Sequence, residues 1–110
     1  MAETPKVLGQ LDPSPATLTT LYTVPSSTVA VVSTITVTNR SSVDTTFRIA
    51  ISPAGAGISD EHYIYYDTTI PGNDTFATTI GISLEATDVI RVLATLATLS
   101  FNAFGIERSP

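Results

Sequence analysis

Apolar and polar side chains alternate along two neighbouring stretches of the chain, residues 28–38 and 43–52. Successive side chains of a β-strand point to opposite faces, so this period of two predicts strands with one buried and one solvated face. Threonine fills much of the solvated parity, where its branched Cβ suits the pleat and its hydroxyl suits water. The residues predicted to face the core are Val29, Val31, Ile35, Val37, Phe47, Ile49 and Ile51.

Turn-forming residues divide the rest of the chain into further short strands. The expected strands are residues 17–24, 28–38, 43–52, 61–69, 75–84, 89–94 and 98–104. Strands at intervals of roughly 8–12 residues are typical of a β-sandwich or barrel. A helix over residues 89–99 is the weaker alternative, because its neighbours are β-branched. We predict one all-β domain over residues 16–110, an antiparallel β-sandwich of about seven or eight strands in immunoglobulin-like or jelly-roll order.

The first 15 residues differ from the rest because several prolines interrupt them. Proline has no N–H to donate to a ladder, so residues 1–15 are expected to form an extended arm or an edge strand. An arm could pair with a neighbouring subunit, whereas the simpler alternative is a frayed terminus. The candidate contact residues of this segment are Pro5, Val7, Leu8, Leu11, Pro13 and Pro15.

Residues 63–66 read Tyr-Ile-Tyr-Tyr, and four bulky residues in succession cannot all face one core. If Tyr63 and Tyr65 point one way, Ile64 and Tyr66 point the other. An exposed tyrosine pair could stack on a sugar or form a subunit interface, because tyrosine buries area and keeps a hydrogen-bonding tip. Hydroxyls reaching the rim of the sandwich are the plainer alternative. We add Tyr63, Tyr65 and Tyr66 to the candidate interface.

Charge and cysteine content narrow the range of partners. The 110 residues carry a net charge of −5, with five scattered cations and no basic stripe, so nucleic acid is not an expected partner. There is no cysteine, which excludes disulfides and thiolate ligands. No apolar run approaches a membrane span, and the first ten residues do not read as a signal peptide. The expected location is the cytoplasm of the producing cell, or a particle assembled there.

The sequence offers little material for catalysis. His62 is the only histidine, and its neighbours Asp60 and Glu61 do not form a natural relay with it on a strand. No calcium loop, zinc motif or nucleophile elbow is present. Asn39 follows a long strand and is interpreted as the start of an Asx turn. We therefore expect no enzyme activity, no catalytic or metal-binding residues and no cofactor.

Three segments carry a resemblance to a known group of proteins. Residues 21–25 read LYTVP, residues 28–41 form a long valine-rich strand that ends in Asn-Arg-Ser, and residues 46–50 read TFRIA. Together they resemble small β-sandwich structural proteins of tailed bacteriophages, over residues 7–104. The resemblance implies a virion component, most simply a capsid decoration (cement) protein that bridges and stabilises capsid subunits. It also implies a closed homo-oligomer, with a trimer favoured, and the major capsid protein or other virion proteins as partners.

Two alternatives stay open at this point. The chain could be a tail, neck or fibre module that binds a host surface glycan or another virion protein. It could also be a host-encoded β domain with another role. The motifs behind the resemblance are strand and turn signals, which specify a fold better than a role.

Overall fold

The computed structural model describes residues 2–79 and 81–109, and nine strands account for most of them. Two short 3₁₀ turns, Pro53–Gly55 (η1) and Asp60–His62 (η2), lie between β4 and β5. The strands are β1 (Ala2–Leu11), β2 (Thr19–Thr23), β3 (Val29–Asn39), β4 (Thr45–Ser52), β5 (Tyr63–Ile70), β6 (Thr75–Thr78), β7 (Ile82–Leu84), β8 (Val89–Ala94) and β9 (Leu99–Ser109).

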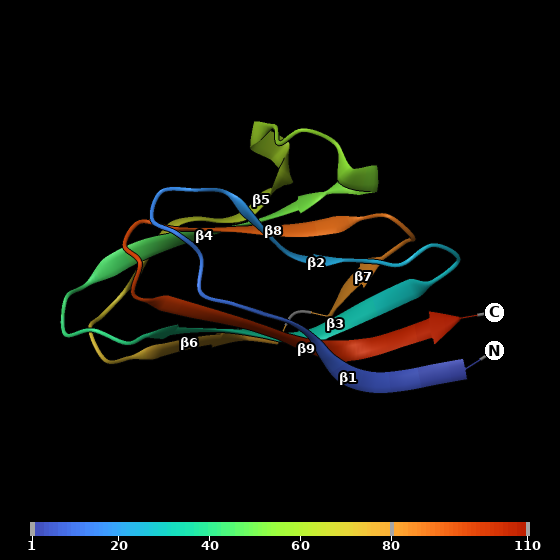
Figure 1. Cartoon of the computed structure of the whole chain (residues 1–110), viewed down its shortest axis with the longest axis horizontal. Helices are drawn as coiled ribbons and strands as arrows, with labels where there is room; N and C mark the ends of the chain where they lie inside the picture. Colours follow the sequence, from blue (N-terminus) through green and yellow to red (C-terminus); the bar gives the residue numbers. More distant parts are fainter. Residues whose placement is uncertain (1, 80, 110) are drawn as a thin grey trace.

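Two antiparallel sheets pack face to face, which confirms the predicted β-sandwich (Figure 1). The larger sheet has the order β1-β9-β3-β6, with β7 also paired to β3. The smaller sheet has the order β2-β8-β4-β5. The expected strand 75–84 is split in two, because Gly81 adopts a φ of +62° between β6 and β7. Both halves pair with β3, so together they form one interrupted edge of the larger sheet.

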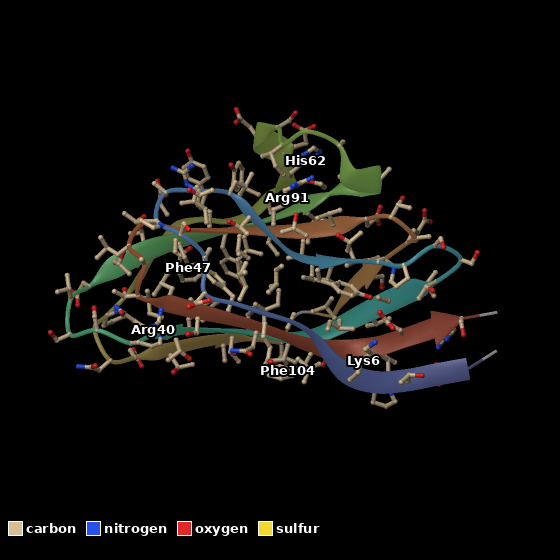
Figure 2. All side chains as sticks on the ribbon, in the orientation of Figure 1. Lys6, Arg40, Phe47, His62, Arg91 and Phe104 are labelled. Atoms are coloured by element: carbon tan, nitrogen blue, oxygen red, sulfur yellow. The ribbon has the colours of Figure 1, made fainter. Side chains whose placement is uncertain are left out.

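Aromatic and branched aliphatic side chains fill the space between the sheets. Phe47 lies between the two sheets (Figure 2). Its ring centroid is 5.1 Å from that of Phe76 and 6.3 Å from that of Phe101. Aromatic pairs at this spacing add to the free energy of burial itself. The predicted core residues Ile35, Val37, Phe47 and Ile49 are fully buried, and Ile51 packs partly buried against them.

The predicted orientation is wrong for Val29 and Val31, which are 43% and 36% exposed. Their neighbours Ala30 and Val32 take the core positions instead, each 1% exposed. The cause is a β-bulge in β3: Val32 pairs with Gly105 and Thr34 with Phe104, so two steps on β3 match one on β9. One extra residue in a strand moves every side chain beyond it to the other face.

Gly105 makes this bulge possible. A Cβ at Gly105 would collide with the backbone carbonyl oxygen of Val31. Only glycine therefore lets β9 approach β3 so closely at the bulge. The bulge and the glycine together decide which valines of β3 reach the solvent.

The proline-rich start of the chain forms an edge strand of the larger sheet, one of the two possibilities that the sequence left open. β1 pairs with β9 from Ala2↔Ser109 to Leu11↔Phe101, so the two ends of the chain lie side by side (Figure 1). A second bulge, at Leu8, lies between the pairs Val7↔Phe104 and Gly9↔Ala103. A single parallel bridge then links Pro15 to Ala94.

Candidate interaction surfaces

The outer face of the larger sheet carries an exposed apolar surface at the end where the two chain termini meet. Register places Pro5, Ile106 and Val31 in one row across three strands, and Val7 beside Phe104 in the next. Figure 2 shows Phe104 on the side of the sheet away from the core. We call this surface the outer apolar patch, formed by Pro5, Val7, Val29, Val31, Phe104 and Ile106.

The sequence contains a signal for this patch that alternation alone does not identify. Residues 29–32 read Val-Ala-Val-Val, an apolar run without the polar partner that a solvated face needs. A strand that is apolar on both faces is generally covered on both. The bulge directs Ala30 and Val32 inwards, and Val29 and Val31 are left outside.

A single ion pair flanks the patch, although the chain as a whole is acidic. Glu3 and Arg108 lie opposite each other in the register, and Arg108 donates hydrogen bonds to the Glu3 carboxylate. At the other end, the Gln10 amide donates to Asn102 Oδ1 at 2.8 Å. The strands of this sheet contain no other charged residue except Lys6 and Glu107, within the described residues.

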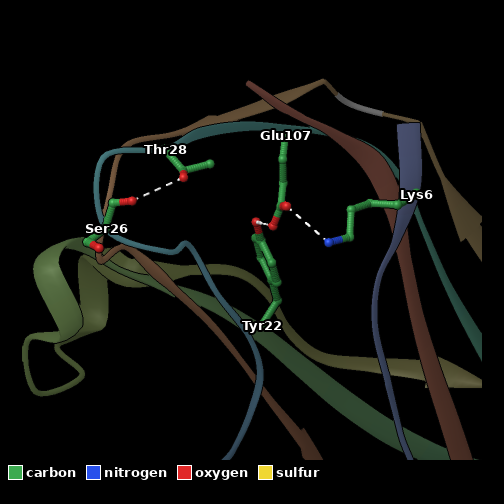
Figure 3. A network of polar contacts seen from close by, with 5 residues as sticks. All are labelled: Lys6, Tyr22, Ser26, Thr28 and Glu107. Carbon is green, nitrogen blue, oxygen red and sulfur yellow. Dashed lines mark hydrogen bonds and ion pairs between the residues drawn. The ribbon is translucent and has the colours of Figure 1, made fainter. Parts of the chain in front are cut away.

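Lys6 and Glu107 point into the sandwich, where they meet a tyrosine from the opposite sheet (Figure 3). Tyr22 donates its hydroxyl to Glu107 Oε2 at 2.6 Å, and Lys6 Nζ lies 3.0 Å from Glu107 Oε1. The Tyr22 hydrogen bond, followed by Lys6, holds the pKa of Glu107 below its ordinary value. Burial, together with the Glu107 carboxylate, raises the pKa of Tyr22. The network fixes Lys6 inwards, so its neighbours Pro5 and Val7 face outwards.

The outer face of the smaller sheet carries a second surface, the arginine–tyrosine cluster, formed by Arg48, Tyr63, Tyr66 and Asp67. Arg48 Cζ lies 4.0 Å from the Tyr66 ring centroid and 5.9 Å from that of Tyr63. The two tyrosine rings meet edge to face, with centroids 5.0 Å apart. Arg48 Nε and Nη2 donate to the two Asp67 carboxylate oxygens at 2.7 and 3.2 Å. This bidentate pair lowers the pKa of Asp67 and raises that of Arg48.

Strict alternation along β5 would place Tyr63 and Tyr65 on one face, and the structure differs. Tyr63 and Tyr66 share the outer face, while Tyr65 packs against the core and bonds Thr78 through its hydroxyl at 2.8 Å. The cause is again irregular register: β5 advances two residues, from Tyr65 to Tyr63, while β4 advances only one, from Ile49 to Ala50. The extra residue, Ile64, brings Tyr63 onto the face of Tyr66. A separate irregularity lies between Thr68 and Tyr65, where Asp67 has a φ of +49°.

The predicted contact residues thus fall into three groups. Pro5, Val7 and Pro15 are exposed, with Val7 at 47%. Leu8 and Leu11 pack against the core, as Tyr65 does, and Pro13 is buried, so none of these presents its side chain to a partner. Tyr66 is 56% exposed, and Tyr63 is partly buried. The structure does not bring the β1 and tyrosine residues together, because they lie on opposite sheets.

The arginine–tyrosine cluster leaves at most one face of Tyr66 open for stacking a sugar. A pyranose needs a free aromatic face, and Arg48 covers one face of Tyr66, whose ring stands at 86° to that of Tyr63. The surface is instead rich in tyrosine and arginine, the side chains that most often dominate binding energy at protein interfaces.

The described residues contain no group of three or more His, Cys, Asp or Glu side chains that could hold a metal ion. His62 Nδ1 accepts a hydrogen bond from the backbone N–H of Ser59 at 3.0 Å, which fixes the turn before β5. Within the same residues, no helix has the length and apolarity needed to cross a membrane.

Comparison with known proteins adds no identification: no protein-family model and no curated protein matches the chain. The fold is an antiparallel β-sandwich with exposed apolar or aromatic side chains on the outer face of each sheet.

Proposed function

We propose that this chain is a non-enzymatic structural protein of a phage virion, a capsid decoration protein that bridges and stabilises neighbouring subunits. The observation that carries the proposal is the pair of surfaces on opposite faces of one sandwich. A domain with a single binding surface can only coat a partner, whereas two opposed surfaces connect two partners. The resemblance of residues 7–104 to tailed-phage structural proteins agrees with this role.

The arginine–tyrosine cluster is the surface that docks on the capsid. Tyr66 offers a large exposed ring, and Arg48 and Tyr63 hold it in place, so little side-chain freedom is lost on binding. The nearby turn adds the acidic residues Asp60 and Glu61, with the Glu61 side chain 75% exposed. The partner surface that fits is a neutral or basic part of the major capsid protein.

Symmetry compensates for the small size of each contact. Decoration proteins bind a shell that repeats the same site many times. Two modest contacts made by one bridging molecule therefore give a higher overall affinity than either contact alone.

The test is whether the chain is found in particles and is retained there through Tyr66. Particles banded on a density gradient from a lysate of the producing host are analysed by peptide mass spectrometry. Tyr66→Ala is compared with Val43→Ala, which truncates a side chain of similar exposure in a turn away from the cluster. We expect about tenfold or greater loss of retention for Tyr66→Ala only. Absence of the chain from particles, or equal retention of both variants, refutes the proposal.

A fibre-type module that binds a host glycan is the second candidate, and the exposed ring of Tyr66 is the observation in its favour. Host lipopolysaccharide, titrated into the protein by calorimetry, separates the two. Saturable binding that Tyr66→Ala abolishes supports the glycan module, and no heat of binding supports capsid docking.

A further inference from the structure

We infer that the outer apolar patch binds the same patch of a second copy of this chain, with the two larger sheets packed face to face. This pairing rests on the proposed function and names the partner of one of its two surfaces. Each bridging unit would then be a two-fold pair, in place of the trimer that the resemblance favours, with an arginine–tyrosine cluster on each outer side.

Charge favours a second copy as the occupant. The chain carries a net charge of −5, so two copies repel one another through most approaches. The outer face of the larger sheet is the exception, because its charged side chains are the mutually paired Glu3 and Arg108. A locally neutral face lets two acidic copies meet with little repulsion, and the patch supplies the attraction.

The strand edges favour packing of faces over addition of strands. β1 contains Pro5, which cannot donate to a new ladder, and the bulge at Leu8 interrupts it further. The opposite edge of the larger sheet is formed by β6 and β7, of four and three residues. Short, bulged and proline-containing edges resist pairing with another chain. The copies therefore meet through their faces.

The dimensions of the sheet leave room for a contact of standard size. The sheets lie one above the other in the view down the shortest axis, so each face has the extents of the longest and shortest axes, 45 and 20 Å (Figure 1). That rectangle encloses about 900 Å², which is the upper limit for the contact, and each partner in a standard interface buries roughly 800 Å². The patch forms the apolar part, and hydroxyl and amide side chains of β3 and β9 form the polar remainder, an anatomy typical of interfaces.

Two-fold symmetry makes every substitution in the patch count twice. Val31→Thr and Val7→Thr each replace an exposed valine by a β-branched residue of similar shape, so the fold should be unaffected. The matched control is Val43→Thr, because Val43 is 57% exposed in the turn between β3 and β4, outside the patch.

The experiment is sedimentation equilibrium of the purified full chain and its variants over a wide concentration range. We expect twice the chain mass of 11.6 kDa for the wild type and for Val43→Thr. Each patch variant should raise the dimer dissociation constant about tenfold, and the double variant about a hundredfold. Circular dichroism checks that all variants remain folded.

Three outcomes overturn the inference: a monomer at every concentration, a trimer, or a dimer that the patch variants leave unchanged. They are distinct from failure of the proposed function, which is read from particle retention of Tyr66→Ala. A chain that is monomeric in solution but retained in particles refutes the self-association alone. A dimer that never enters particles refutes the virion role alone.

Discussion

The contact between Tyr22 and Glu107 joins the two sheets, and Tyr22→Phe removes it without changing the shape of the ring. The hydroxyl donates to a carboxylate at 2.6 Å, and Tyr22 itself is only 7% exposed. Hydrogen bonds to charged groups contribute about 1.5–3 kcal/mol. The Glu107 side chain keeps 16% exposure and its contact with Lys6, so water and the ammonium offset part of the loss. We expect Tyr22→Phe to lower the free energy of unfolding by about 1–2 kcal/mol at pH 7.

The expected fall in melting temperature follows from the size of the chain. An unfolding entropy of about 2.1 cal/mol/K per residue gives about 0.23 kcal/mol/K for 110 residues, so Tm should fall by about 4–9 °C. Differential scanning calorimetry measures this change directly. Tyr22→Phe and wild type should have the same far-UV circular dichroism, because no backbone contact is altered.

The loss of stability caused by Tyr22→Phe should depend on pH. The pKa of Glu107 is lowered in the folded state, so its contribution is complete above the ordinary glutamate pKa of 4.5 and is lost as pH falls through the folded value. The raised pKa of Tyr22 stabilises the fold below its ordinary pKa of 10.0, and that contribution is lost as pH rises further. The stability difference between wild type and Tyr22→Phe should therefore shrink below pH 4.5 and above pH 10.0. A difference that is independent of pH, or absent at pH 7, would refute this reasoning.

Two further substitutions test the local origins of the fold. Gly105→Ala should lower the free energy of chemical unfolding by more than about 2 kcal/mol, because its Cβ would collide with the Val31 carbonyl oxygen. Gly57→Ala, with open space around the new Cβ, should change that free energy by less than about 0.5 kcal/mol. Equal stability of the two alanine variants would contradict the close approach. Asn39→Ala should cost about 1–3 kcal/mol in the same assay, because the Asn39 side chain is buried and its Nδ2 donates to the Val43 carbonyl at 2.8 Å, across the exposed turn that follows β3. An unchanged denaturation midpoint would show that water replaces this bond.

Alternation predicted those parts of the fold in which the strands are regular. Phe47 and Ile49 are buried as expected, and β8 has the predicted bounds of residues 89–94. The Asx turn at Asn39 is also confirmed, because Asn39 Oδ1 accepts the backbone N–H of Ser41 at 3.1 Å. These features depend on side chains close in sequence, which a single sequence displays directly.

The candidate surfaces could be predicted only in part, because bulges control them. The orientation of Val31 depends on a bulge beside Gly105, which lies more than 70 residues further along the chain. Pairing of Tyr63 with Tyr66 depends on an extra residue in β5 relative to β4. Such register shifts are properties of two strands together, and no local pattern encodes them.

Burial of the outer apolar patch in an assembly is most directly tested by thiol labelling. The chain has no cysteine, so Val31→Cys and Val43→Cys each introduce one reporter, and cysteine preserves the apolar character of the site. The rate of reaction with a soluble disulfide reagent is measured as a function of protein concentration. Labelling at position 31 should slow as the protein concentration rises, while labelling at position 43 should stay constant. Equal, concentration-independent rates at both positions would contradict the assignment of this face as an interface.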